Sequence, residues 1–208
     1  EWRSLLAARR WAIMVSEIKR MSAVLAAKPR RPDVQELYKR AGEISALVGA
    51  RARQTESDRR VSAEVVQMMR QAELFKVLQP QSYGGFEYGF DVFVNTIATI
   101  GRGCGSSAWV FGILASHQWI TACFPKQAQD DFWKNPDALA AGSYAPVGQG
   151  LKEEGGFRLS GKWGFASGCE NADWIYLGGM AHGEDGPRPG LFLVPMSECT
   201  IEDNWYTM

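Results

Sequence analysis

The spacing of apolar residues changes near residue 137, and this change limits the folds that the chain can adopt. Before it, apolar side chains recur every three to four residues, which is typical of helices packed on a core. After it come short runs rich in aromatic and β-branched residues, separated by Gly, Pro or Asp: LAAGSYAP, GFRLSGKWGFASG, DWIYLGGM and PGLFLVPM. Helices and strands in separate blocks predict an α+β fold and argue against an alternating Rossmann sheet.

The helical block is expected to contain five helices and one irregular connector. Paired glycines and a proline in LFKVLQPQSYGGFEYG (74–89) predict a turn-rich connector with closely approaching backbone. Gly-Cys-Gly at 103–105 interrupts the pattern, so Ser106 or Ser107 is expected to cap a very apolar helix that runs to about Cys123. The other expected helices are 33–56, 62–72 with Ser62 as N-cap, 90–101 and the short polar 126–134.

The strand block is expected to form an antiparallel β-domain, a sandwich or barrel, because turn signals recur about every 8–12 residues. The predicted domains are a helical domain at 21–136 and a β-domain at 137–208. The chain begins at Glu1, and Met21 would be a natural start, so residues 1–20 are expected to be upstream sequence or a non-native extension. The last residues, IEDNWYTM, read as an unfinished strand, which indicates a fragment.

Composition excludes several classes of function. Lys+Arg and Asp+Glu number 23 each, so no overall field favours nucleic acid or an anionic membrane. No apolar run approaches the roughly 20 residues of a membrane span, and no signal peptide is expected. The four cysteines form no CxxC pair, and with only two histidines a metal site is not expected. The cysteines are therefore expected to be reduced, mostly buried thiols of an intracellular, cytoplasmic protein.

His117 is the first candidate for chemistry. It lies in the apolar run AWVFGILASHQWI, eight residues after Trp109 and on roughly the same helical face. A buried histidine must satisfy both ring nitrogens, and it titrates near neutral pH. Two interpretations stay open: a core histidine bonded to a backbone carbonyl, or a base that faces a ligand pocket beside the β-domain.

Ser143 and Ser167 are weaker candidates. Ser143 lies among small residues in AAGSYAP, where backbone N–H groups could approach a planar ligand. Ser167 follows Phe165 by two residues, so that a ring could cover a flat ligand while the hydroxyl bonds its edge. Ordinary strand-edge or turn hydrogen bonding explains either serine equally well. No GxGxxG, GxSxG or Ser-His-Asp set is visible, so spacing alone names no reaction.

Three ordered motifs resemble the oxygenase components of two-component flavin-dependent monooxygenases. They are GCGSSAWVFGILASHQW, AAGSYAPVGQG and LSGKWGFASGCENADWIYLGG, and the resemblance covers about residues 33–208. The 4-hydroxyphenylacetate hydroxylases and the hydroxylases of steroid-derived phenols belong to this family. The resemblance implies the acyl-CoA dehydrogenase fold, with an N-terminal helical domain, a middle β-domain and a C-terminal helical bundle that is absent from these 208 residues.

The resemblance also implies roles for individual residues. His117 matches the histidine beside the substrate phenol, and Ser143 and Ser167 match serines near the flavin. Trp109 and Phe165 match aromatic residues that line the flavin site, with the backbone of Tyr144 and Ala166 nearby. Catalytic roles are thus expected for His117, Ser143 and Ser167. Flavin contacts are expected from Trp109, Ser143, Tyr144, Phe165, Ala166 and Ser167.

The implied reaction is ortho-hydroxylation of a small phenolic or aromatic substrate by O₂ through a flavin C4a-hydroperoxide. Reduced FMN or FAD would come from a separate flavin reductase, and a homotetramer is implied for the full-length enzyme. His117 as a base has a chemical purpose here, because a phenolate is a better nucleophile than a phenol. No nucleic acid, membrane or metal partner is implied.

Two rival interpretations remain. An acyl-CoA dehydrogenase, oxidising an acyl-CoA thioester with FAD, usually shows a Thr-Glu-Pro run where this chain has Tyr144-Ala145-Pro146. It usually shows Trp-Ile-Thr-Asn at Phe165-Ala166-Ser167-Gly168 and has no counterpart of His117, so these departures favour the oxygenase. A non-catalytic fragment is the third hypothesis, since the missing bundle contributes to the substrate and flavin sites of the family.

Overall fold

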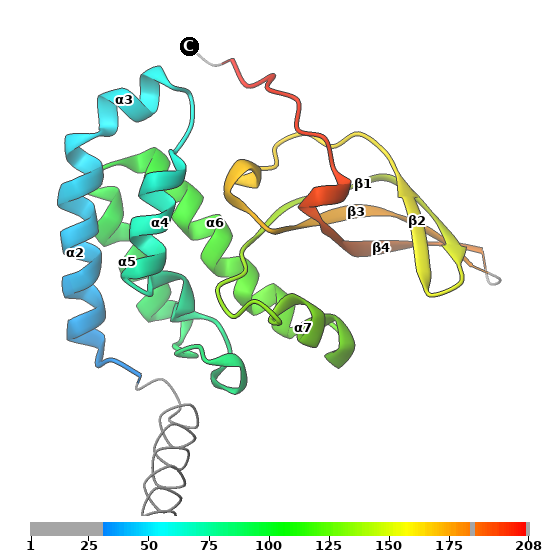
Figure 1. Ribbon diagram of the computed structural model, residues 1–208, viewed down its shortest axis with the longest axis horizontal. Coiled ribbons are helices and arrows are strands. Elements are labelled where there is room, and N and C mark those ends of the chain that lie inside the picture. Colours follow the sequence, from blue (N-terminus) through cyan, green and yellow to red (C-terminus); the bar gives the residue numbers. More distant parts are fainter. Residues whose placement is uncertain (1–30, 184–185, 207–208) are drawn as a thin grey trace, which may run out of the picture. The chain divides into compact units, whose positions relative to one another are not determined.

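The computed structural model describes residues 31–183 and 186–206, and from Pro32 onward the chain forms one compact unit. The expected extension at 1–20 lies outside the described residues. Because helices and sheet share this unit, the predicted domain boundary between 136 and 137 stays a prediction. The order of the elements is as expected: helices come first and strands follow (Figure 1).

Helices occupy the first part of the described chain. The main ones are α2 (Val34–Ala50), α4 (Ala63–Gln71), α5 (Phe90–Gly101) and α6 (Gly105–Ala122). Shorter segments are α3 (Ala52–Ser57), α7 (Lys126–Phe132) and the single turns η1 (Leu74–Val77) and η2 (Gln81–Tyr83). The helix expected at 33–56 is therefore broken at Arg51 into α2 and α3.

Local signals explain where several helices start. Ser62 caps α4, as predicted, because its side chain accepts a hydrogen bond from the Val65 N–H. The predicted cap of α6 was wrong: Cys104 is the N-cap residue. Ser107 instead turns inward, and its buried hydroxyl has no hydrogen-bond partner within the described part of the chain.

The interrupting glycines have a packing reason. A Cβ on Gly103 would lie 2.0 Å from the Ser45 carbonyl oxygen, so only glycine allows the turn before α6 to pass α2. In the connector at 74–89, a Cβ on Gly85 would lie 2.0 Å from the Gln79 carbonyl oxygen. The close backbone approach expected there is confirmed.

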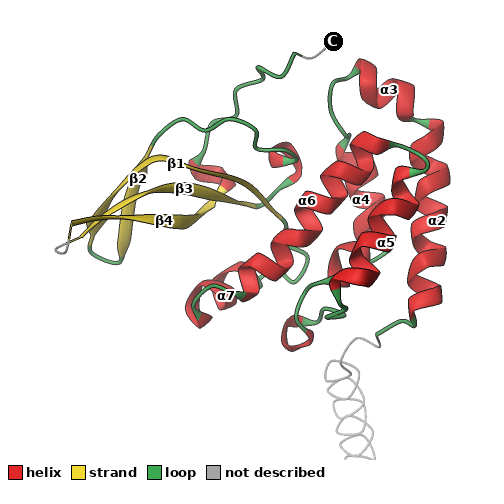
Figure 2. Cartoon of the chain, turned by 180° about the vertical axis from the view of Figure 1, so that it is seen from behind, coloured by secondary structure: helices red, strands yellow, loops and turns green. Residues whose placement is uncertain are grey.

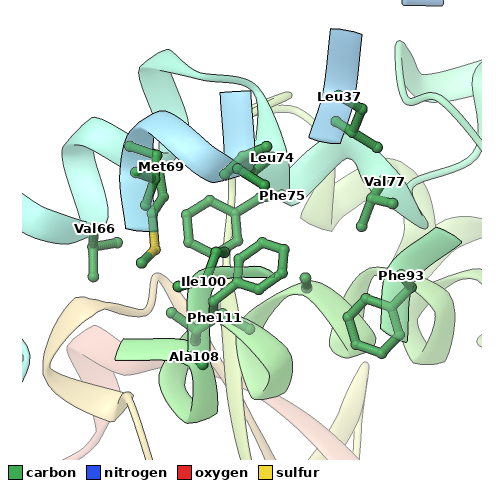
Figure 3. Packing of buried hydrophobic residues seen from close by; sticks show 14 of the residues in the cluster. Leu37, Val66, Met69, Leu74, Phe75, Val77, Phe93, Ile100, Ala108 and Phe111 are labelled. Atoms are coloured by element: carbon green, nitrogen blue, oxygen red, sulfur yellow. The ribbon is translucent and has the colours of Figure 1, made fainter. Parts of the chain in front are cut away.

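The helices share one apolar core. Phe111 of α6 lies at its centre, with ring centroids 5.5 Å from Phe75 and 6.4 Å from Phe93 (Figure 3). Leu37 and Met69 are fully buried in the same cluster. Burial of whole apolar side chains stabilises a fold by roughly 1.5–3 kcal/mol each, so this cluster fixes α6 against its neighbours.

The strands form one four-stranded sheet in the order β2-β1-β3-β4. The strands are β1 (Ala140–Glu153), β2 (Gly156–Ser160), β3 (Trp174–Gly183) and β4 (Gly186–Pro195). β1 and β2 are antiparallel, as are β3 and β4, but β1 and β3 run parallel. The sheet is thus mixed, and the expectation of an antiparallel domain was wrong for the β1–β3 pair, because residues 161–173 lead from β2 past β1 to β3 on the far side of β1.

Two segments read as strands are not strands. The run GFRLSGKWGFASG is extended only over β2, and residues 161–166 form a loop that leads into the η3 turn (Cys169–Asn171). The last run, IEDNWYTM (201–208), was expected to be an unfinished strand, but it has no regular structure over 201–206, and 207–208 lie outside the described residues. It is held instead by charge: Asp203 lies 2.7 Å from an Arg59 guanidinium nitrogen and 3.2 Å from one of Arg60.

α6 lies between α2, α4 and α5 on one side and the sheet on the other in both views of the molecule (Figures 1 and 2). Its N-terminal half packs in the helical core through Ala108, Phe111 and Leu114. Its C-terminal half reaches the start of β1, where Gln118 donates to the Ala138 carbonyl over 2.8 Å. α6 is therefore the element that joins the two blocks.

Three further expectations concern cysteines, membranes and metals. Cys104 is buried, but Cys123 is exposed and the other two cysteines are partly exposed, so "mostly buried" was wrong although all four are free thiols. Across the residues that the structure describes, no helix combines the length and apolar character that crossing a membrane requires. Those residues also contain no group of three His, Cys, Asp or Glu side chains arranged to bind a metal.

Candidate active site

The imidazole of His117 on α6 is buried and hydrogen-bonded at both ring nitrogens. Its side chain is only 2% exposed. Nδ1 lies 2.6 Å from the Ala140 carbonyl oxygen at the start of β1, and Nε2 is hydrogen-bonded to the Tyr144 hydroxyl. The ring is thus bonded to a backbone carbonyl, as the first interpretation expected, and its second nitrogen faces the phenol of Tyr144; a base that faces a ligand pocket stays a prediction.

These two contacts fix the tautomer of His117. A carbonyl oxygen only accepts, so Nδ1 carries the hydrogen that is donated to Ala140. Burial is the main cause that holds the pKa of His117 below its ordinary value, while the bond to the Ala140 carbonyl opposes the shift. The ring is therefore neutral near pH 7, Nε2 carries a lone pair, and the Tyr144 O–H donates to it. This arrangement is that of a base with its accepting nitrogen defined.

Two phenols adjoin this ring. Burial raises the pKa of Tyr144 to about 12, so its hydroxyl stays protonated and acts as a donor. Tyr176 stands edge-on to the imidazole at 5.3 Å, and burial raises its pKa as well. Its hydroxyl is hydrogen-bonded to Thr121 and does not contact Nε2.

Two glycines leave the space that allows Tyr144 to reach His117. A Cβ on Gly142 would lie 3.0 Å from His117 Cε1 and 3.2 Å from the Tyr144 hydroxyl. A Cβ on Gly178 of β3 would lie 2.2 Å from the Tyr144 carbonyl oxygen. Between Ser143 and Gly148 the register of β1 against β3 shifts, as at a β-bulge. Bulges redirect side chains, and here the irregular segment directs the phenol at the base.

The other predicted residues form a second group near the N-terminal half of α6. Trp109 is 63% exposed, unlike His117, and its indole N–H donates to Ser167 Oγ over 3.1 Å. Ser143 donates to the Gly164 carbonyl over 2.7 Å and so ties β1 to the loop 161–168. Phe165 is 82% exposed, with φ +59°, and its ring meets that of Trp205 edge-on.

The structure thus brings the predicted residues together in two places. His117 and Tyr144 are in contact at one, and Trp109 and Ser167 at the other, with Phe165 and Ala166 on the same loop as Ser167. Eight residues of α-helix separate Trp109 from His117, a rise of about 12 Å. A hollow of about 300 Å³ lies beside α4 and η3, and its lining contains none of the predicted site residues.

Comparison with known proteins decides the family. No protein-family model matches the chain. It is 41% identical over 181 residues to the oxygenase component of the FADH(2)-dependent resorcinol hydroxylase of Rhizobium sp. (strain MTP-10005), covering 86% of this chain and 44% of the relative. It is 36% identical over 179 residues to the oxygenase component of the p-hydroxyphenylacetate 3-hydroxylase of Acinetobacter baumannii, covering 84% of this chain and 42% of the relative.

The chain belongs to the family of flavin-dependent oxygenase components. It spans about half the length of the curated relatives it matches. Among solved structures, the HsaA monooxygenase of M. tuberculosis superposes with a TM-score of 0.80 at 34% identity, over 85% of this chain and 49% of that one. The predicted α+β, acyl-CoA dehydrogenase-like fold is thereby confirmed.

A reduced flavin is the cofactor that this family implies, and the residues around Ser167 fit one. Trp109 and Phe165 expose large rings, which a flat heteroaromatic ligand could cover. Because Ser167 Oγ accepts from Trp109, its own O–H remains a donor for the polar edge of such a ligand. The donor set therefore suits a planar ring with hydrogen-bonding edges.

The sequence missed the most specific contact of the site. Tyr144 was expected to contribute backbone near the flavin, whereas its hydroxyl is bonded to His117 Nε2. The carbonyl that sets the tautomer, Ala140, was not singled out at all. The sequence did contain a signal for this contact. In Gly142-Ser143-Tyr144 the glycine lies two residues before the tyrosine, on the same face of the strand, and so leaves room for the tyrosine ring to lie back along the strand.

Proposed function

We propose that this chain is part of an enzyme that hydroxylates a small phenol, ortho to its hydroxyl group, with reduced flavin and O₂. One observation supports this most strongly. The buried, neutral His117 presents its accepting nitrogen to the phenol hydroxyl of Tyr144, so this nitrogen can accept from a phenol. The relatives named as resorcinol and p-hydroxyphenylacetate hydroxylases act on phenols. The reaction is therefore a hydroxylation in which the phenol is first deprotonated.

His117 accepts the substrate proton at Nε2. The phenol O–H bond breaks and an N–H bond forms, which leaves a phenolate with a nucleophilic ortho carbon. Burial keeps the ring neutral before this step, and the Ala140 carbonyl, which accepts from Nδ1–H, stabilises the imidazolium after it. Tyr176 and the start of β1 enclose the ring and keep water from competing for Nε2.

The loop 161–168 and Trp109 hold the cofactor. Reduced FMN or FAD, when bound, supplies the activation of O₂. Ser167, held by Trp109 of α6, would donate to the polar edge of the flavin, and Phe165, with Ala166 beside it, would contribute the apolar contact to its ring. Ser143 fixes this loop on β1 through Gly164 and so sets its position relative to His117.

The partners follow from the family. As an oxygenase component, the protein would receive reduced flavin from a separate flavin reductase, consistent with the FADH(2)-dependent relative. We further propose a cytoplasmic enzyme that forms a homotetramer in its full-length form. Size-exclusion chromatography with light scattering measures the oligomer, and reconstitution with a purified reductase, NADH and flavin tests whether hydroxylation requires a second protein.

Stopped-flow absorbance is the direct test of the reaction. The full-length protein with reduced flavin is mixed with oxygenated buffer, with and without a phenol such as resorcinol. Hydroxylation predicts a catechol-type product in amounts that match the flavin oxidised. Flavin that is instead bleached by an acyl-CoA under anaerobic conditions would replace the proposal with a dehydrogenase.

Substitution at His117 tests the base. His117→Asn should lower product formation by roughly 10²–10⁴-fold, because general-base catalysis contributes about that much. Flavin binding should change little, since Trp109, which holds Ser167, lies about 12 Å along α6 from His117. His182→Asn is the matched control: this histidine is half-buried on β3, where it is bonded to Gln149. Unchanged hydroxylation by His117→Asn would remove the base from the mechanism.

Substitution at Ser167 tests the cofactor site. Ser167→Ala removes the hydroxyl that accepts from Trp109 and donates outward. Reduced flavin should bind roughly twofold to tenfold more weakly, the effect of one net hydrogen bond. Anaerobic titration measures this affinity, with Ser160→Ala on exposed β2 as the control. Equal affinities for the two variants would reduce Ser167 to an ordinary loop serine.

A further inference from the structure

The accepting nitrogen of the proposed base is already engaged by a phenol of the protein itself. Tyr144 donates its hydroxyl to His117 Nε2, and the other ring nitrogen is committed to the Ala140 carbonyl. A neutral imidazole has one lone pair for a strong hydrogen bond. A second phenol therefore cannot bond to Nε2 while Tyr144 remains there.

No other approach to the ring is open. His117 is 2% exposed, and the edge of Tyr176 covers one side at 5.3 Å. On the strand side, the clearance is so small that even a methyl group at Gly142 would press on both His117 and Tyr144. The ring that can leave is that of Tyr144, which is 50% exposed at the edge of the site.

The backbone holds Tyr144 in this position while leaving its side chain at the surface. The Tyr144 carbonyl lies against Gly178 of β3, where a Cβ would approach it to 2.2 Å. The following residues, up to Gly148, form the irregular part of the β1–β3 pairing. A fixed backbone with a half-exposed ring permits rotation of the side chain about its own bonds without loss of the strand.

We propose that Tyr144 is an internal competitor of the substrate: a phenol that occupies the place of the substrate hydroxyl on His117 and is exchanged for it when substrate binds. This inference rests on the proposed function and adds to it the rule by which the site selects its ligand. An aromatic ligand with a hydroxyl replaces one O–H···N bond by another, whereas a ligand without a hydroxyl leaves Nε2 buried and unpaired. The site thus selects phenols over other flat aromatic molecules of the same size.

The exchange is nearly balanced in free energy. Tyr144 gives up one hydrogen bond in the protein and gains one to water when its ring turns outward, and the ligand does the reverse. The net contribution of a typical hydrogen bond corresponds to roughly 2- to 10-fold in a binding constant. Tyr144 should therefore weaken phenol binding by about that factor.

Ligand binding to the full-length protein, without flavin or O₂, tests the exchange. The probes are phenol and its methyl ether, anisole, which has the same ring but no O–H. Tyr144→Phe should bind phenol and anisole each roughly 2- to 10-fold more tightly than the wild type, because either ligand must displace the Tyr144 hydroxyl from His117 in the wild type, and both proteins should bind phenol more tightly than anisole. Tyr38→Phe makes the same chemical change on α2, at a half-buried residue outside the site, and should alter neither affinity.

A spectroscopic signature reports the contact itself. With ¹⁵N-labelled histidine, the Nε2 resonance of His117 should shift in Tyr144→Phe and return toward the wild-type value when phenol is added. Phenol affinity that falls or stays unchanged in Tyr144→Phe would overturn the exchange. A lost kcat with unchanged phenol affinity would also overturn it, because Tyr144 would then carry the proton and not compete for its acceptor.

The proposed function and the exchange of Tyr144 can be refuted independently of each other. If the full-length protein with reduced flavin hydroxylates no phenol, the proposed function is wrong, yet the exchange on His117 remains measurable by titration and by the Nε2 resonance. If hydroxylation occurs and Tyr144→Phe leaves KM and phenol affinity at the wild-type values, the exchange alone is wrong. The expected pattern in Tyr144→Phe is a lower KM for phenol.

Discussion

Gly142→Ala should disturb the His117–Tyr144 contact without removing either partner. The new methyl group would lie 3.0 Å from His117 Cε1 and 3.2 Å from Tyr144 Cζ, where ordinary van der Waals contact begins at 3.4 Å. The imidazole is buried and held at Nδ1 by Ala140, so it has little freedom to retreat. Tyr144 is half-exposed, and it is therefore the ring that should move.

The expected loss in the free energy of unfolding follows from these two close contacts. Overpacking by one methyl group in a packed site costs about 1–3 kcal/mol. Replacing glycine by alanine also restricts the unfolded chain, which offsets about 0.4–1 kcal/mol. We therefore expect Gly142→Ala to lower the free energy of unfolding by about 1–2 kcal/mol and to shift the His117 Nε2 resonance.

Urea unfolding provides the measurement, read as a change in midpoint at constant slope. Gly156→Ala on β2 is the matched control, because a Cβ there has no atom within 4 Å and only the effect on the unfolded chain remains. That variant should be as stable as the wild type or slightly more so. A Gly142→Ala protein as stable as Gly156→Ala, with an unshifted Nε2 resonance, would refute the tight packing of this site.

Three further predictions concern stability. Ser62→Ala removes the cap of α4 and should cost about 1 kcal/mol in urea unfolding. Gly103→Ala should destabilise the fold strongly, because its Cβ would lie 2.0 Å from the Ser45 carbonyl oxygen. Gly42→Ala, which has open space on α2, should stabilise the fold by up to about 1 kcal/mol. Similar urea midpoints for the two variants would contradict this. Burial holds the pKa of His117 below its ordinary value of about 6.5, so below that pH the unfolded chain binds more protons than the folded chain. Stability should therefore rise with pH through this range by at most about 1.4 kcal/mol per unit, and unfolding curves of His117→Asn at several pH values should lack that contribution.

The sequence predicted elements that depend on neighbouring residues. The Ser62 cap and the bounds of α5, Phe90–Gly101, follow from side chains within one helical turn. The α6 cap failed because two serines and a glycine offered competing starts, and tertiary packing drew Ser107 inward. Local signals are reliable where a single residue can satisfy the backbone, and less so where several compete.

Contacts between distant segments could not be read from the sequence. The parallel pairing of β1 and β3 depends on the path of residues 161–173, which carries no periodic signal. The direction of the Tyr144 ring depends on Gly178, 34 residues further along, because only that close approach allows the bulge. His117 could be named from its surroundings, but the partner of its second nitrogen required the fold.

α6 carries Trp109 and His117 on the same continuous rod, and this has a consequence for how such an enzyme could evolve. The interval between the cofactor loop and the base, about 12 Å along the axis, is set by the helical rise and not by an adjustable loop. Inserting one residue between them would turn His117 by about 100° away from Ala140 and break the site. Under the proposed function, adaptation to longer or shorter phenols would therefore come from the strands that face this helix, and β1, with its irregular stretch after Ser143, is the part free to change.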